Sequence, residues 1–523
     1  MNIKRTKEEI KNTISAYLLK DEFGNYRIPS IRQRPVFLLG SPGIGKTQIM
    51  EQIARECGIG LVAYTITHHT RQSAIGLPFI SKKQYGGKEY AVTEYTMSEI
   101  VGSIYEKMEQ TGLAEGLLFI DEINCVSETL APAMLQFLQC KSFGNHKIPE
   151  GWVIVAAGNP PEYNKSVREF DVVTMDRVKK IQVEADFEVW KEYAYANQLH
   201  GAVISYLNTR KQNFYQMENT VDGMHFATPR GWEDLSNMIQ VYEKLGKTMD
   251  REVVEQYIQF PKIAKDFANY LELYYKYRTD YQIEEIFQGK LDEILLKKVS
   301  HASFDEKLSV VGLILSKVNE AMKNAVRAQA YMELLQSYLM EYKSLIEDSA
   351  GSERHGEAEC GAGIERANEK RENGLNGQQL FSNICQKAVV EHKQKKKAEL
   401  LTREEDYRYR QVIRTLEKIL QEMKLLSVQD TAVCFAKAKE FFAQKNEQYE
   451  KIQQEAEQKL EYAFDFMEGA FGNSQEMVMF ITELNSNAGS VAFLQESDCE
   501  RYYQYNKELL FDDKRRKILE KIQ

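Results

Sequence analysis

One eight-residue segment has the residue types of a phosphate-binding loop. It fits the pattern G-x-x-x-x-G-K-[ST] and consists of Gly40, Ser41, Pro42, Gly43, Ile44, Gly45, Lys46 and Thr47. Glycines let backbone N–H groups surround phosphate oxygens, and a helix that follows presents its positive end to the anion. We expect Lys46 to neutralise the β- and γ-phosphates and the Thr47 hydroxyl to bind Mg²⁺. The segment therefore predicts a nucleotide-binding site.

Two acids, Asp121 and Glu122, follow directly after the apolar run 117–120. Acids at a strand end can merely cap the next helix. A phosphate-binding loop, however, needs a second strand that brings a carboxylate to the metal. We therefore expect Asp121 to hold Mg²⁺ through water and Glu122 to polarise the attacking water, since water is a weak nucleophile at neutral pH. The pair predicts hydrolysis of ATP to ADP and phosphate.

A third polar residue, Asn159, ends the apolar run 152–157 within the sequence Ala-Ala-Gly-Asn-Pro. Taken alone, Asn-Pro is an ordinary turn former. Because it follows the lysine loop and the two acids in chain order, we interpret Asn159 as a nucleotide sensor. It would orient the attacking water or contact the γ-phosphate.

The elements expected to position these residues alternate along the first half of the chain. Apolar runs, which suit strands buried on both faces of a parallel sheet, lie at 36–39, 61–64, 117–120 and 152–157. Helical patterns lie at 6–20, 46–57, 97–110 and 127–139. This alternation predicts an α/β P-loop NTPase core, with a parallel sheet flanked by helices. A Gly-Gly pair between two strand-like runs also predicts a β-hairpin near 79–92.

The second half of the chain has a different character. All ten prolines lie between Pro29 and Pro261, so the remainder favours long uninterrupted helices. From about 188 to 347 the pattern is helical, with breakers at Asp222-Gly223 and Phe260-Pro261. Residues 349–378 are rich in Gly, Glu and Asn, which predicts a flexible linker. The Lys-, Glu- and Gln-rich stretch 393–459 predicts a coiled-coil-like helical hairpin.

The ordered set of motifs resembles the MoxR family of AAA+ ATPases, in the clade marked by an insertion in the second helix. The loop, the acid pair and Gly158-Asn159-Pro160 are followed by Glu169-Phe170-Asp171 and Met175-Asp176-Arg177, and the hairpin matches the insertion. The resemblance covers roughly residues 30 to 300. It implies a homo-oligomeric, hexameric ring that binds ATP with Mg²⁺ and remodels or assembles a client protein, often with a partner bearing a von Willebrand factor A domain.

Two arginines receive roles from this resemblance. Arg177 falls on the family's arginine finger, which acts across a subunit interface, although Val178 stands where the family often has an aromatic residue. Arg230, within Thr228-Pro229-Arg230, falls on the lid residue that contacts the γ-phosphate. Without the resemblance, an ion pair or a helix-dipole interaction is the simpler interpretation of either arginine.

The motifs and the resemblance together predict six segments. They are an N-terminal helix (1–30), an α/β nucleotide-binding core with the hairpin insert (31–190), a helical lid (191–300), a helical extension (301–347), a flexible linker (348–378) and a C-terminal helical, coiled-coil-like domain (379–523). Residues 300–523, the last 220 or so, have no counterpart that we recognise in the family.

Composition narrows the function classes. With 523 residues, 43% hydrophobic and 28% charged, the chain has the composition of a soluble globular protein of several domains. No apolar run is long enough for a membrane helix, and the start at Met1 lacks the apolar stretch of a signal peptide, so we expect a cytoplasmic protein without membrane partners. Seven scattered cysteines without a CxxC pair predict reduced thiols.

Two alternatives to a chaperone-like client-remodelling ATPase stay open. One is a nucleic-acid-directed AAA+ motor or restriction-type NTPase, against which the net charge of −9 and the lack of a recognisable DNA-binding module argue. The other is a nucleotide-gated scaffold that binds ATP but barely turns it over, against which Glu122, Asn159 and both arginines argue. The sequence identifies neither the client nor the direction of remodelling.

Overall fold

The computed structural model describes residues 1–143, 145–163, 167–168, 170–221, 223–353, 376–426 and 429–507. The chain forms two compact units. The first comprises Met1–Trp190, Phe214–Trp232 and Gln394–Thr402, and the second comprises Lys191–Asn213, Glu233–Lys393 and Arg403–Gln523.

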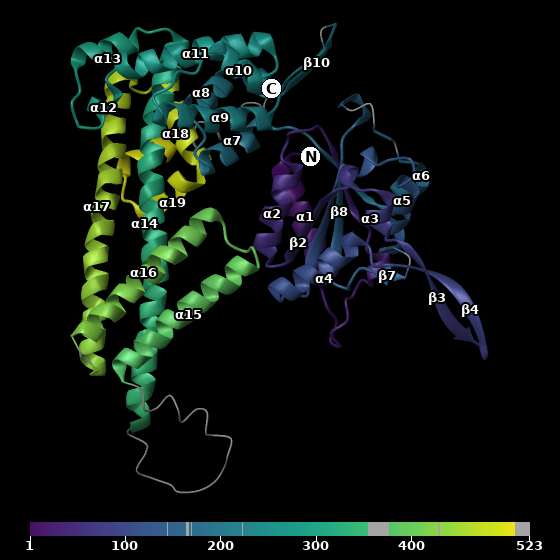
Figure 1. Ribbon diagram of the computed structural model, residues 1–523. Coiled ribbons are helices and arrows are strands. Elements are labelled where there is room, and N and C mark those ends of the chain that lie inside the picture. Colours follow the sequence, from purple (N-terminus) through teal and green to yellow (C-terminus); the bar gives the residue numbers. More distant parts are fainter. Residues whose placement is uncertain are drawn as a thin grey trace, which may run out of the picture. The chain divides into compact units, whose positions relative to one another are not determined.

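A five-stranded sheet forms the centre of the first unit (Figure 1). Its strands, in order across the sheet, are β2 (Gly60–Thr65), β5 (Gly116–Asp121), β8 (Trp152–Gly158), β1 (Val36–Gly40) and β9 (Lys179–Val183). Every pairing between neighbours is parallel. The predicted fold class is confirmed. β9 was not among the predicted strands, because its sequence Lys-Lys-Ile-Gln-Val contains no continuous apolar run.

The strand side chains alternate between two hydrophobic cores, one on each face of the sheet. Leu118 and Ile120 pack into a core that includes α4 (Glu99–Thr111) and α5 (Ala131–Cys140). Leu117 and Phe119 pack into the other, with α1 (Ile3–Leu18) and α2 (Lys46–Cys57). Since both faces are covered, the strands appear in the sequence as unbroken apolar runs.

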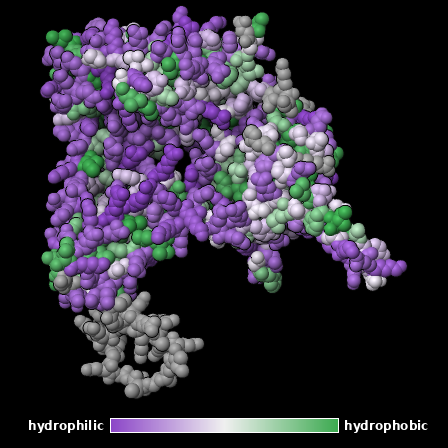
Figure 2. Space-filling view, in the orientation of Figure 1, coloured by the Kyte–Doolittle hydropathy of each residue, from purple (hydrophilic) through white to green (hydrophobic). Residues whose placement is uncertain are grey.

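Two antiparallel hairpins extend the first unit. β3 (Pro78–Tyr85) and β4 (Lys88–Tyr95) follow α3 (Arg71–Ile75) and project as a ribbon (Figure 1). The predicted hairpin at 79–92 lies within this ribbon. Its base is hydrophobic, with Phe79 and Ile80 exposed, and its tip is hydrophilic (Figure 2).

The second hairpin corrects the helical pattern expected around residue 222. β10 (Gln216–Thr220) pairs with β11 (Gly223–Ala227), and Gly223 begins the return strand at φ +126°. The sequence predicts a break between two helices at Asp222-Gly223. In the structure, Gly223 instead begins the second strand of a hairpin. The short strands β6 (Ser142–Phe143) and β7 (His146–Lys147) and helix α6 (Val172–Arg177) also belong to this unit.

The second unit is helical. Its shorter helices are α7 (Phe187–Ala196), α8 (Gly201–Thr209), α9 (Pro229–Lys244), α10 (Arg251–Tyr257), α11 (Pro261–Asp280), α12 (Ile283–Ile286), α13 (Glu293–Ser300), α18 (Gln475–Ser486) and α19 (Ala488–Glu496). The first residues of α7 and α9 belong to the first unit.

Long helices dominate the proline-free half. α14 (Phe304–Glu353) has 50 residues and runs beside α17 (Thr431–Phe471), which has 41 (Figure 1). α15 (Gly377–Lys397) and α16 (Arg403–Leu425) pack against both around a core that includes Leu335, Phe381 and Leu416. These helices confirm the predicted largely helical C-terminal region. No helix among the described residues is long and apolar enough to cross a membrane.

The predicted linker at 348–378 overlaps both flanking helices. Its first six residues continue α14, and α15 begins at Gly377. Residues 354–375, on which the prediction of flexibility chiefly falls, lie outside the described residues. The two helices thus extend into both ends of the predicted segment.

Candidate nucleotide site

The sheet brings the predicted phosphate and metal residues to one edge. β8 lies between β1 and β5, and all three strands are parallel. The loop 40–47 follows β1, Asp121 ends β5, and Asn159 follows β8. Ligands of open α/β sheets bind outside the carboxyl ends of the strands. The topology thus joins segments that are far apart in the sequence.

The loop's backbone is shaped by two glycines. Gly43 and Gly45 adopt φ +77° and +92°, a region that side chains other than glycine rarely enter. A Cβ added at Gly43 would lie 3.2 Å from the Cβ of Thr228, so a side chain there would also crowd the start of α9. Ile44 packs into the core beneath the sheet and anchors the loop, while Gly45 leads directly into α2. The N-terminus of this 12-residue helix, where backbone N–H groups favour an anion, thus directly follows the loop.

Lys46 lies at the centre of the site. Its Nζ donates to the carbonyl oxygens of Gly40 (2.6 Å) and Ser41 (2.8 Å) and to Oδ1 of Asn159 (3.0 Å). The pKa of Lys46 is lowered to about 8, chiefly by burial and also by the positive charge of Arg230, against the attraction of Asp121. A buried ammonium without a carboxylate in direct contact favours a polyanion beside it.

Thr47 and Asp121 form an oxygen pair next to Lys46. The Thr47 hydroxyl donates to Oδ2 of Asp121 at 2.8 Å, and Oδ1 of Asp121 accepts the backbone N–H of Glu122 at 2.9 Å. Hydroxyl and carboxylate oxygens are the ligands that Mg²⁺ takes beside phosphates. The donor set therefore fits Mg²⁺ at this position.

Glu122 stands in an unusual backbone conformation. Its φ of +56° and ψ of +33° are left-handed, which costs a non-glycine residue of order 1–3 kcal/mol. Its carboxylate Oε2 accepts the hydroxyl of Thr67, which lies in the turn after β2, at 2.9 Å. Sequence reasoning missed Thr67. It follows β2, the neighbour of β5, so the carboxyl-end rule would identify it once the strand order is known.

Asn124 is a second residue that the sequence did not reveal. Its Nδ2 donates to the carbonyl oxygen of Asn159 at 2.7 Å, and its Oδ1 accepts the N–H of Asn159 at 3.3 Å. The side chain is buried and fills the space beside Gly158, where a Cβ would lie 2.4 Å from Oδ1. Asn124 thereby fixes the backbone that presents the Asn159 amide to Lys46.

Arg177 is not part of this group. It is the last residue of α6, which the Asp171 carboxylate caps by accepting the N–H of Thr174. Its exposed guanidinium donates to Oε1 of Gln139. No hydrogen bond or ion pair among the described residues joins it to the loop or the two acids. Glu169, in the preceding motif, lies outside the described residues.

Arg230 lies on the phosphate side of the site. It is the second residue of α9, and its backbone N–H donates to the Gly43 carbonyl at 3.2 Å. Its exposed guanidinium is near enough to lower the pKa of Lys46. The structure thus brings this arginine toward the loop within the first unit.

Fold and site together define a P-loop nucleotide-binding domain: a parallel sheet, a glycine-shaped loop leading into a helix, and an acid on the neighbouring strand end. Residues 36–176 match the family model of the ATPase family associated with various cellular activities (AAA), and this part of the chain is an AAA ATPase domain. The family implies an ATP-driven activity. A search of curated proteins returned no match to the chain.

The match to the family model contains the loop, both acids and Asn159, and it ends one residue before Arg177. Arg230 also lies beyond it. The roles of the two arginines therefore stay predictions that rest on the motif resemblance and on the local geometry.

Proposed function

We propose that this protein hydrolyses ATP to ADP and phosphate with Mg²⁺ and, as a MoxR-like AAA+ ATPase, uses the energy to remodel or assemble a client protein. One observation supports the proposed hydrolysis. The residues expected to bind and cleave ATP lie together at one edge of the sheet, linked by the contacts described above: Lys46, Thr47, Asp121, Glu122 and Asn159.

Each residue has a separate task in this proposal. Lys46 and the loop N–H groups bind the phosphates, and Thr47 with Asp121 would hold Mg²⁺. The metal would neutralise charge on the phosphate oxygens. Glu122 takes a proton from the attacking water as the new O–P bond forms and the bond to ADP breaks. Asn159, held by Asn124, orients that water or contacts the γ-phosphate.

The proposed assembly is a homo-oligomeric, hexameric ring in which Arg177 enters a neighbour's site. Its exposed position and neutral partner Gln139 support this, because no carboxylate among the described residues forms an ion pair with the guanidinium, although its charge helps to lower the pKa of Asp171. The partner class, a client or a protein with a von Willebrand factor A domain, rests on the motif resemblance alone.

The decisive experiment compares Glu122→Gln with a matched control, Glu128→Gln. Glu128 is exposed and pairs with Arg168, so its change removes one carboxylate near the site without touching the chemistry. We expect Glu122→Gln to bind ATP normally and to lose roughly 10²–10⁴-fold in turnover, the usual worth of a positioned base. Turnover in Glu122→Gln equal to that of the control would overturn the assignment.

One observation favours a second candidate, a nucleotide-gated scaffold with little turnover. The Thr67 hydroxyl holds the Glu122 carboxylate at 2.9 Å, and a carboxylate held this way is a weaker base. Steady-state ATPase measurement on the full chain separates the two. A basal rate below about one turnover per hour, unchanged by assembly, would favour the scaffold, whereas ordinary ATPases work at roughly 1 s⁻¹ or faster.

A further inference from the structure

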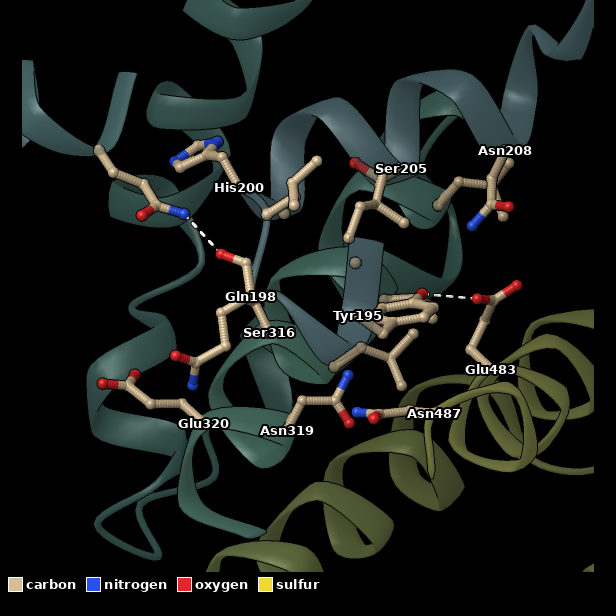
Figure 3. Close-up of a pocket in the computed structure, with 18 of the residues that line it drawn as sticks. Tyr195, Gln198, His200, Ser205, Asn208, Ser316, Asn319, Glu320, Glu483 and Asn487 are labelled. Carbon is tan, nitrogen blue, oxygen red and sulfur yellow. Dashed lines mark hydrogen bonds between the residues drawn. The ribbon is translucent and has the colours of Figure 1, made fainter. Parts of the chain in front are cut away.

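A cavity of about 370 Å³ lies inside the second unit, among α7, α8, α9, α14 and α18 (Figure 3). Cavities of a few hundred Å³ accommodate small organic molecules. Its lining contains none of the residues of the nucleotide site. It is a separate feature for which the ATPase activity gives no explanation.

One part of the wall is apolar. Leu199, Ile204, Leu308, Val311 and Leu315 line the cavity, and all five are buried. Gly312 lies on the same stripe of α14, and a Cβ there would lie 2.8 Å from the Cβ of Ser205. The helices are thus already in contact around the cavity, and the wall favours an apolar body rather than water alone.

An unsatisfied donor belongs to Asn319, a lining residue further along α14. Oδ1 of Asn319 accepts the Ser490 hydroxyl at 2.7 Å, but its enclosed Nδ2 has no hydrogen-bond partner in the described part of the chain. A buried N–H group without an acceptor destabilises the folded chain, because its hydrogen bond to water is not replaced. Asn319, Glu320 and Asn487 line the lower part of the cavity in Figure 3. An acceptor atom on a ligand would recover the cost.

A cation follows one helical turn later. Lys323 lies four residues beyond Asn319 on α14, and its Nζ donates to the carbonyl oxygen of Ala196 at 2.7 Å. An ammonium has three donors, so this bond leaves two for a ligand. Burial lowers the pKa of Lys323, with Arg327 adding to the effect and Glu404 opposing it. An anion in the cavity would reverse that shift.

The carboxylates in the lining do not repel such an anion strongly. Glu483 is buried, but it accepts from Lys191 Nζ at 2.9 Å and from the Tyr195 hydroxyl at 2.5 Å (Figure 3). Glu243 lies 3.3 Å from Nε2 of His200, also pairs with Arg278, and has a lowered pKa. Glu320 and Lys244 are exposed to solvent. Lys323 is therefore the lining cation best placed to pair with a buried anion.

We infer that this cavity binds a small monocarboxylate with an apolar body. The carboxylate accepts from Asn319 Nδ2 and pairs with Lys323, and the body packs along Leu315 toward the apolar wall. The lining side chains change character along α14. They are apolar at 308 and 311, polar at 319 and cationic at 323, which matches a molecule with one apolar and one anionic end.

The test is calorimetric titration of the full chain with hexanoate and with its neutral analogue hexanamide. We expect saturable hexanoate binding, with hexanamide at least tenfold weaker. Asn319→Leu and Lys323→Met should each weaken hexanoate at least tenfold. Lys343→Met is the matched control, because Lys343 lies exposed on the same helix and pairs only with Glu347 there. This control should leave the affinity unchanged.

A fourth variant tests the inference even if Asn319→Leu or Lys323→Met disturbs the fold. Ser316 lines the cavity but is exposed, so Ser316→Phe can fill the space without replacing a core side chain. Circular dichroism verifies the fold of each variant. Equal affinity for hexanamide, unchanged affinity in Ser316→Phe, or no saturable binding of hexanoate at millimolar concentrations would each overturn the inference.

Discussion

The residues at the strand ends and the two arginines of the first unit differ in how the fold holds them. Lys46, Asp121 and Asn159 have hydrogen-bond partners inside the site. Arg177 and Arg230 are exposed and lie on helices outside the sheet, Arg230 beside the loop and Arg177 beside Gln139. One half of the site is built by the parallel sheet, and the other half comes from side chains that can move.

This difference separates the steps of ATP hydrolysis into two kinds. The sheet positions the residues for binding and proton transfer, whereas charge stabilisation by the arginines depends on movement or assembly. Buried polar groups with fixed partners are preorganised for binding and for proton transfer. Arg230 already adds its charge beside Lys46, whereas Arg177 would add charge at the phosphates only when assembly brings α6 to a neighbour's site. The substitutions below would break or sharpen this division.

The largest effect is expected for Arg177→Ala. If the arginine completes a neighbour's site, turnover should fall about 10³–10⁵-fold with ATP binding intact. Arg251→Ala is the control, since Arg251 is an exposed arginine that pairs with Glu255 on α10. Mixing Arg177→Ala with Glu122→Gln subunits should restore part of the activity, because an Arg177→Ala pocket keeps its base and borrows an arginine. Co-purified mixtures no more active than their parents would count against action across an interface.

Lys46→Met should affect binding first. Loss of a buried, hydrogen-bonded charge costs about 2–5 kcal/mol, so ATP affinity should fall at least about 30-fold while the loop backbone remains. Unchanged affinity, measured by titration, would contradict the role of the loop.

The lowered pKa of Lys46 gives that residue a pH signature. With a pKa of about 8, the side chain is charged below pH 8 and increasingly neutral above it. Bound phosphates favour the charged form, so ATP binding near pH 8.5 should take up a proton, and affinity should fall as pH rises beyond 8. Calorimetry in buffers of different ionisation enthalpy measures the uptake. Lys141→Met should retain it, although Lys141 is also buried with a pKa lowered to about 8.

Asn124→Ala should have a smaller effect, roughly tenfold in turnover, because it displaces Asn159 without removing it. It also leaves the Asn159 N–H and C=O groups unsatisfied, so the free energy of unfolding should fall by about 1–3 kcal/mol. Asn124→Asp keeps the acceptor but places a carboxylate oxygen against the Asn159 carbonyl, and it should be no more stable. Wild-type turnover in Asn124→Ala would show that Asn159 needs no such support.

The smallest effect is expected for Thr67→Val. Removing the hydroxyl that holds Glu122 frees the carboxylate, and a single hydrogen bond is worth about 0.5–1.5 kcal/mol. Basal ATPase should therefore rise about two- to tenfold, while Thr93→Val, in the β4 hairpin strand, changes nothing. A fall in rate would mean that Thr67 positions the base rather than restraining it.

Local signals made the strand-end half of the site predictable from the sequence. The loop 40–47 is contiguous, and Asp121 and Asn159 each end an apolar run, so their elements could be placed without knowledge of the sheet order. Thr67 and Asn124 could not be found in this way. Thr67 comes close to Glu122 only because β2 pairs with β5, and Asn124 comes close to Asn159 only because β5 pairs with β8.

The fold shows the same limit. β9 was missed because its sequence Lys-Lys-Ile-Gln-Val has no continuous apolar run, and β10 with β11 because a polar hairpin has none either. The cavity of the second unit is less predictable still. Leu199, Asn319 and Glu483 reach it from segments more than a hundred residues apart, and no spacing in the sequence relates them.

Mechanically, α14 is a lever. A continuous helix of 50 residues is about 75 Å long at 1.5 Å per residue. Near its start it lines the cavity at Leu308 and Val311, and further along it supplies Leu335 and Tyr342 to the core shared with α15, α16 and α17. A stiff rod of that length, tilted by about 5° at the cavity, would carry its far end through roughly 6 Å. Small rearrangements around the cavity would therefore be amplified along the second unit.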